Sequence, residues 1–132
     1  MSSLKDLRKE LAIALFGSEY LDPKKWKKYC FVWNSLTEEE KKRVRKDVLY
    51  LNSTAIDLAH IFSRSTHPDL KFSMENVVFI ARGFHSFLTN KKSFFKGEEN
   101  IFLAPNEVYL FYLRANSLKE YKLRRHLWTK IK

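Results

Sequence analysis

Histidine side chains are the groups in this 132-residue chain best suited to acid–base or metal chemistry: His60, His67, His85 and His126. Asp57 and His60 would share one face of a helix at a spacing of three residues, with Asp69 in the loop that follows. A metal centre needs several ligands at matched spacing, and the chain has no Cys-x-x-Cys or His-Glu-x-x-His motif. The sequence therefore predicts no metal site.

Nucleophilic catalysis has equally little support in the sequence. The single cysteine, Cys30, lies in an aromatic segment in which a buried, inert thiol is expected. There is no Gly-x-Ser-x-Gly elbow and no glycine-rich phosphate loop, so we predict no catalytic residue, no cofactor and no enzyme activity. One enzymatic alternative stays open: a metal-free nuclease built from His60, His67 or His85 with a lysine follows no local spacing rule.

The net charge is the strongest functional indication in the composition. The chain has 25 Lys and Arg residues against 15 Asp and Glu residues, which gives a formal charge of +10. The excess lies in residues 1–50 and 91–132, on either side of a neutral, apolar middle segment. Such a distribution indicates a core segment flanked by basic, solvent-facing elements, and it favours an anionic partner.

The C-terminal segment carries the clearest basic stripe. On a helical wheel that begins at Leu118, apolar side chains fill one arc, which also holds Glu120 and, as an exception, Arg124. The opposite arc contains no acidic residue and consists of Lys119, Lys122, Arg125, His126, Lys130 and Lys132. A basic stripe without acidic neighbours repels itself, so it indicates a phosphate backbone, an acidic protein surface or an anionic membrane as ligand.

Two further groups of lysines differ in their surroundings. One lies opposite the aromatic face of Trp26, Tyr29 and Trp33 on the second predicted helix, and comprises Lys24, Lys25, Lys27 and Lys28. Tryptophans that alternate with lysines can stack on bases, but the spacing favours tryptophans in the core and lysines in solvent. The second group, residues 41–46, follows Glu38, Glu39 and Glu40 at a spacing of four, which indicates support of a helix rather than a binding surface.

We therefore predict a small nucleic-acid-binding module that contacts phosphates through the terminal basic arc and the lysines at 24–28, within a larger complex. Nothing in the sequence separates RNA from DNA as the ligand. The alternative is a non-enzymatic adaptor that binds a protein partner, or a second copy of itself, through exposed aromatic and apolar helix surface. A third reading, a peripheral membrane protein, is disfavoured, and no apolar run reaches the 18 or so residues that span a bilayer.

The elements that must position these side chains are predicted to be helical, because three glycines and three prolines are too few for the turns of a β-sandwich. Ser3 and Gly17 are predicted to cap a first helix over 4–16, and Asp22 with Pro23 to open a second. Thr37 begins a capping box and a helix that extends to about Phe62, with a break at 52–54 nearly as well supported. Further helices are predicted over 74–88, from about 105, and over 118–131.

The predicted fold class is a mostly α, compact single-domain bundle of five or six helices over residues 1–132. The alternative is an α+β fold, because segments near 77–81 and 101–113 are rich in strand-forming residues. The lone cysteine and the mixed charges of the N-terminus favour an intracellular, reducing compartment, the cytoplasm or the nucleus.

Overall fold

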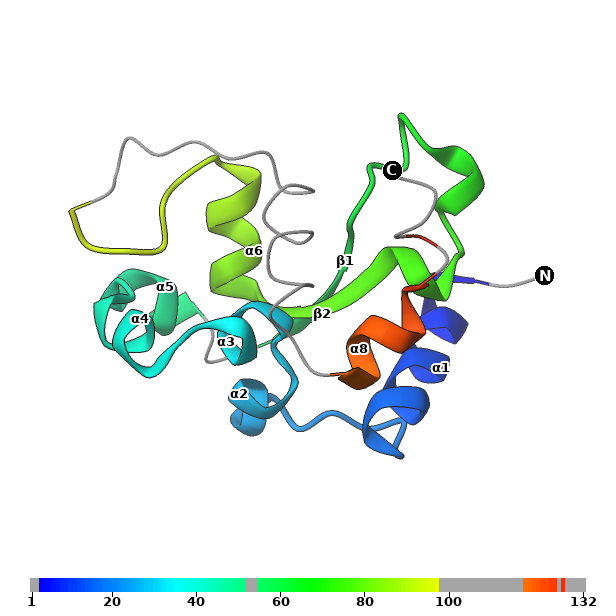
Figure 1. Ribbon diagram of the computed structural model, residues 1–132, viewed down its shortest axis with the longest axis horizontal. Coiled ribbons are helices and arrows are strands. Elements are labelled where there is room, and N and C mark those ends of the chain that lie inside the picture. Colours follow the sequence, from blue (N-terminus) through cyan, green and yellow to red (C-terminus); the bar gives the residue numbers. More distant parts are fainter. Residues whose placement is uncertain (1–2, 52–54, 98–117, 126, 128–132) are drawn as a thin grey trace.

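A computed structural model describes residues 3–51, 55–97, 118–125 and 127 of the chain (Figure 1). Within these residues the protein is mostly helical and contains one antiparallel β-hairpin, formed by β1 (Ile56–His60) and β2 (Val77–Ala81). Helix α1 (Leu4–Phe16) lies on one side of the hairpin and helix α6 (Arg82–Thr89) on the other. The helical prediction is therefore confirmed in general, but the bundle is not, because a β-hairpin lies between the helices.

Helix α1 begins and ends as its sequence predicts. The Ser3 hydroxyl accepts a hydrogen bond from the Asp6 amide over 3.1 Å. Gly17 ends the helix in the left-handed region, with φ of 71°, and its amide donates to the Ile13 carbonyl over 2.9 Å. Glycine is favoured there because a side chain would strain this conformation. Leu7, Leu11 and Leu15 face the core.

The second predicted helix is interrupted at Cys30. Asp22 caps a 3₁₀ turn, η1 (Pro23–Lys25), which leads into α2 (Trp26–Tyr29); a separate helix, α3 (Phe31–Ser35), follows. Cys30 has an extended backbone, and its sulfur accepts a hydrogen bond from the Ala81 amide over 3.4 Å. The break puts Tyr29 in the core layer shared with α1 and Phe31 in the layer shared with α6.

The predicted helix from Thr37 to Phe62 is wrong beyond Arg43, and the alternative break at 52–54 lies outside the described residues. The capping box is present: Thr37 and Glu40 exchange hydrogen bonds of 3.1 and 2.8 Å at the start of α4 (Glu38–Arg43). The helix ends there because the backbone on either side of Val44 pairs with residues 94–96, through Arg45 N to Phe94 O at 2.8 Å and Lys96 N to Arg43 O at 3.1 Å. A short helix, α5 (Lys46–Tyr50), follows, and the chain then enters β1.

The predicted helix over 74–88 is also corrected. Its first half forms a 3₁₀ turn, η4 (Met74–Asn76), and then β2, and only its second half is helical, as α6. Val77–Ile80 is a run of strand-forming side chains within a segment whose apolar spacing also fits a helix. Pairing with β1 makes this run a strand. The predicted strand alternative near 77–81 is therefore confirmed. The segment 101–113 lies outside the described residues.

Both faces of β2 are covered. Val77 and Phe79 pack with α1, whereas Val78 and Ile80 pack with Phe84 of α6. All five residues of β2 are buried, which explains why its sequence is continuously apolar rather than alternating.

The connection between the strands is held by Asn76, whose side chain is fully buried. Its amide group exchanges hydrogen bonds with both backbone groups of Phe62 and donates a further one to the Leu70 carbonyl. These bonds fix the loop that contains a third 3₁₀ turn, η3 (Pro68–Leu70).

Helix α8 (Leu118–Leu123) begins where the sequence predicts, and residues 128–131 of the predicted helix lie outside the described part of the chain. Leu123 packs in the layer shared with α1, and Leu127 is buried in the layer shared with α6. No helix among the described residues is both long enough and apolar enough to cross a membrane.

Candidate functional site

The lysines of η1 and α2 project into solvent, as their position opposite the aromatic face predicts. Tyr29 and Cys30 are buried and the two tryptophans are half-buried. The exposed side chains are Lys24, Lys25, Lys27 and Lys28. Within the described part of the chain, none of these four ammonium groups forms an ion pair with a carboxylate. Their positive charge is therefore available to an external anion.

The tryptophans between these lysines contribute to packing. Trp26 and Trp33 meet edge to face at 5.4 Å between ring centroids. The Lys27 ammonium nitrogen lies 5.1 Å from the Trp33 centroid and 5.7 Å from that of Trp26, and Lys41 approaches Trp33 to 5.4 Å. Because lysine side chains already cover these rings, the geometry favours the packing interpretation over base stacking.

Helix α8 and the residues directly after it place two further basic side chains in solvent, Lys122 and Arg125. The helix is seated by Leu123, which packs in the same apolar layer as Tyr29, and by Arg124, whose guanidinium lies 5.6 Å from the Phe31 ring centroid. Elements that bear both predicted basic groups thus pack around β2. The side chains of Lys119, His126, Lys130 and Lys132 lie outside what the structure describes.

Arg124, the exception on the apolar arc, is fully buried. It is paired with Glu120 and donates a hydrogen bond from Nη2 to the Val77 carbonyl over 2.7 Å. Burial lowers the pKa of Arg124, and Glu120 opposes that shift. An arginine keeps its charge under these conditions, so Arg124 stabilises the fold and is not part of the exposed basic surface.

Three of the basic residues of 41–46, Lys41, Lys42 and Arg45, form local ion pairs, but at spacings other than the predicted four. The predicted Glu38–Lys42 and Glu39–Arg43 pairs are replaced by Glu38–Lys41 at 3.2 Å and Glu39–Lys42 at 3.7 Å. Arg43 lies over the Phe95 ring, and Arg45 pairs with Asp47 at 3.1 Å.

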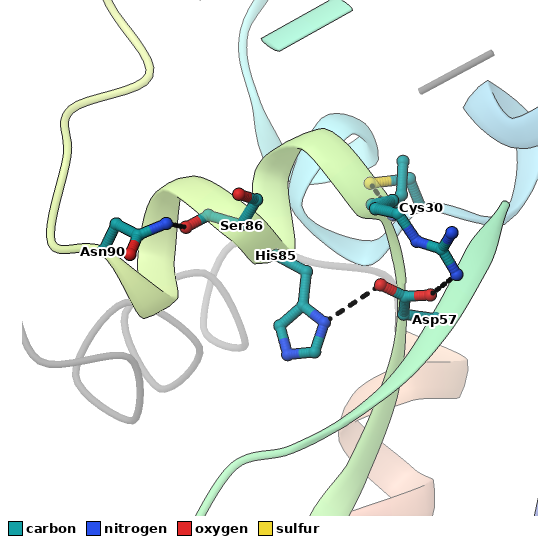
Figure 2. Close-up of polar contacts among 7 residues, drawn as sticks. Cys30, Asp57, His85, Ser86 and Asn90 are labelled. Atoms are coloured by element: carbon teal, nitrogen blue, oxygen red, sulfur yellow. Dashed lines mark hydrogen bonds and ion pairs between the residues drawn. The ribbon is translucent and has the colours of Figure 1, made fainter. Parts of the chain in front are cut away.

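A polar cluster that the sequence did not reveal joins β1 to α6 (Figure 2). Asp57 accepts a hydrogen bond from Arg82 Nη2 on one carboxylate oxygen, and its other oxygen lies 3.1 Å from His85 Nδ1. Burial opposes ionisation of Asp57, but Arg82 and His85 outweigh it, so the pKa of the carboxyl is lowered. These partners are 25 and 28 residues away in the sequence, and no local pattern links them.

His60, His67 and His85 each have a different environment in the structure. Asp57 and His60 point to opposite faces of β1 because side chains alternate along a strand, which corrects the expectation of a shared helix face. The His60 Nε2 atom lies 2.9 Å from the Lys71 carbonyl oxygen, and burial lowers the pKa of this imidazole. His67 Nδ1 lies 2.9 Å from the Thr66 hydroxyl. Among the described residues, no group of three potential ligands could hold a metal ion.

His60, His67 and His85 nevertheless border one hollow of about 690 Å³, which we call the β1–α6 hollow. Its walls also include Leu4 of α1, Leu58 of β1 and Leu88 of α6. With Nδ1 held by Asp57, the His85 Nε2 atom has no hydrogen-bond partner in the described part of the chain. The hollow therefore combines an apolar lining with three imidazole side chains at its border.

Cys30 is buried as predicted, although it lies between two helices and not within one. Burial raises the pKa of its thiol to about 11, against the opposing effect of the Ala81 amide. A thiol in this state is a poor nucleophile.

Comparison of the chain with protein-family models, curated proteins and solved structures finds no match.

Proposed function

We propose that the protein binds nucleic acid through electrostatic contacts with phosphates, made by the exposed cations of η1, α2 and the segment from α8 to Arg125. The interface comprises Lys24, Lys25, Lys27, Lys28, Lys122 and Arg125. The observation that carries the proposal is the absence of any described ion pair from the four lysines of η1 and α2 to a carboxylate.

The contrast with neighbouring charges supports this assignment. Lys41, Lys42 and Arg45 each form an ion pair with an acidic side chain, so their positive charge is compensated within the protein. The four lysines of residues 24–28 lack such partners, although they lie close together in one short segment and repel one another. Bound phosphates would reduce this repulsion. Long, flexible lysine side chains favour contacts with the backbone of the nucleic acid, which carry no base sequence information.

The test is fluorescence anisotropy with labelled single-stranded and double-stranded RNA and DNA over a range of salt concentrations. Each phosphate contact on duplex DNA contributes about −0.9 to the slope of log K against log salt concentration. We expect a slope of about −4, which a five-site variant, K24Q/K25Q/K28Q/K122Q/R125Q, reduces to near zero. Lys27 is retained in this variant because it covers the two tryptophans.

A matched control removes the same number of charges elsewhere: K5Q/K9Q/K46Q/K91Q/K96Q, all at exposed lysines. This control is expected to keep most of the affinity. Equal losses in the two variants would show that net charge alone drives binding, and no binding at low salt would refute the proposed function.

A further inference from the structure

Among the described residues, no hydrogen-bond partner meets the backbone groups on the outer edge of β1. The ladder between the strands is bracketed by Arg82 N to Ala55 O at 3.3 Å and Ile61 N to Asn76 O at 2.8 Å. In an antiparallel pair the bonded positions alternate, so the N–H and C=O groups of Ile56, Leu58 and His60 point away from β2. In the part of the chain that the structure describes, none of these six groups is hydrogen-bonded.

The outer edge of β2 differs, because side chains occupy it at both ends. The Ala81 amide donates to the Cys30 sulfur, and the Val77 carbonyl accepts from Arg124. Proteins protect an open strand edge with lysine, proline, a bulge or an inward-pointing charge, and β1 has the sequence Ile-Asp-Leu-Ala-His, in which the one charged residue, Asp57, is already bound by Arg82 and His85. Within the described part of the chain, the hairpin thus has one edge with side-chain partners at both ends and one open edge.

The β1–α6 hollow lies along this open edge. Leu58 and His60 are on the face of β1 that packs toward α1, whereas Ala59 is on the face toward α6, and all three line the hollow. Its remaining walls come from both layers, with Leu4 of α1 on one side and Leu88 of α6 on the other. A space bordered by both faces of a strand lies beside its edge, where an additional strand would pair.

The charges around the hollow select the chemistry of a ligand. Exposed Arg64 and the half-buried histidines 60, 67 and 85 border it. The nearby carboxylate of Asp57 is already bound by Arg82 and His85. Arg64 is the one charged side chain among the residues that line the hollow, and the imidazoles add polar nitrogen atoms beside it. The positive charge of Arg64 favours acidic side chains in whatever pairs with the strand.

We propose that the open edge of β1 binds an extended, acidic peptide segment of a partner protein, which joins the hairpin as a third strand. The peptide backbone pairs with Ile56, Leu58 and His60, and its carboxylates face Arg64 and the histidines. Five paired residues span about 16 Å, the length of β1. Backbone pairing supplies affinity and the lining of the hollow supplies specificity, as in other cases of strand addition.

The experiment uses the full chain and two labelled octapeptides of alternating valine with either glutamate or lysine. We expect the glutamate peptide to bind at least tenfold more tightly than the lysine peptide. A glutamate peptide N-methylated at alternate amides on its pairing edge should lose binding, whereas methylation of the opposite edge should not affect it. Hydrogen exchange should show the Ile56, Leu58 and His60 amides slowed at least tenfold by the glutamate peptide.

The matched protein variants are Arg64→Glu at the hollow and Lys46→Glu at an exposed lysine of α5, with the same change of charge. Arg64→Glu should weaken the glutamate peptide by about tenfold, and Lys46→Glu by much less. Equal binding of both peptides, or no binding at millimolar concentration, would overturn the proposal.

Two other results of the exchange experiment would also overturn it. Protection of the three amides in the free monomer would show that the edge is already paired. Protection that rises with protein concentration, together with dimers in sedimentation, would show that a second copy of the chain takes the place of the partner.

Discussion

Arg124 of the C-terminal segment donates a hydrogen bond to the carbonyl oxygen of Val77, the first residue of β2, over 2.7 Å. A fully buried arginine thus closes one end of the strand edge that β1 does not use. The same guanidinium is paired with Glu120 one helical turn earlier. The contact ties α8 to the hairpin and gives a buried charge a structural role.

Replacing Arg124 with alanine should destabilise the protein by about 3–5 kcal/mol, because Glu120 loses its buried counter-ion. The double variant E120L/R124M should regain part of this loss, since well-packed apolar side chains often substitute for a buried pair. Urea unfolding followed by circular dichroism measures both changes. Arg125→Ala, at the exposed neighbour, is the control and should change stability by less than about 0.5 kcal/mol. Similar effects at 124 and 125 would contradict the assigned role.

Asp57 should make the stability of the protein depend on pH in the acidic range. Its pKa is lowered in the folded state, so its contribution is present above the unfolded value of about 3.9 and is lost as the pH falls through the folded pKa. Asp57→Asn should therefore be less stable than the wild type at neutral pH, with a difference that vanishes in acid. Urea unfolding at several pH values tests this expectation. Asp69→Asn, at an exposed carboxylate, serves as control, and a pH-independent difference for Asp57→Asn would refute the prediction.

Asn76→Ala should cost about 2–3 kcal/mol, because it leaves the partly buried backbone groups of Phe62 and the buried carbonyl of Leu70 without the Asn76 partner. The loss should appear in thermal unfolding and as faster hydrogen exchange of the Phe62 amide. Asn90→Ala removes a single exposed side-chain bond, to the Ser86 carbonyl, and is expected to have a small effect. A Phe62 amide that exchanges at the same rate in the Asn76 variant would show that these bonds do not hold the loop.

The Cys30 thiol should resist modification in the folded protein. With a pKa of about 11, roughly one thiol in a thousand is ionised at pH 8, and the sulfur is fully buried. We expect the native protein to react with a disulfide reagent at least a hundredfold more slowly than the urea-unfolded chain. Absorbance of the released thiolate measures both rates, and comparable rates would contradict the predicted burial.

The local parts of the fold were predictable from the sequence. The Ser3 and Gly17 caps define α1, the Thr37–Glu40 box begins α4, and the lysines of α2 lie opposite their aromatic neighbours, as expected. Each of these features depends on groups within four residues of one another. Short-range hydrogen bonds and helical periodicity are sufficient to specify them.

Only the tertiary structure decided where helices give way to strands. The apolar spacing from Val44 to Phe62 fits a helix, yet pairing with residues 94–96 ends α4 and pairing with β2 makes 56–60 extended. The Asp57–Arg82–His85 cluster and the open edge of β1 are consequences of the same pairing. Backbone pairing joins segments distant in the sequence, and its free energy overrides local preferences that differ by less than about 1 kcal/mol per residue.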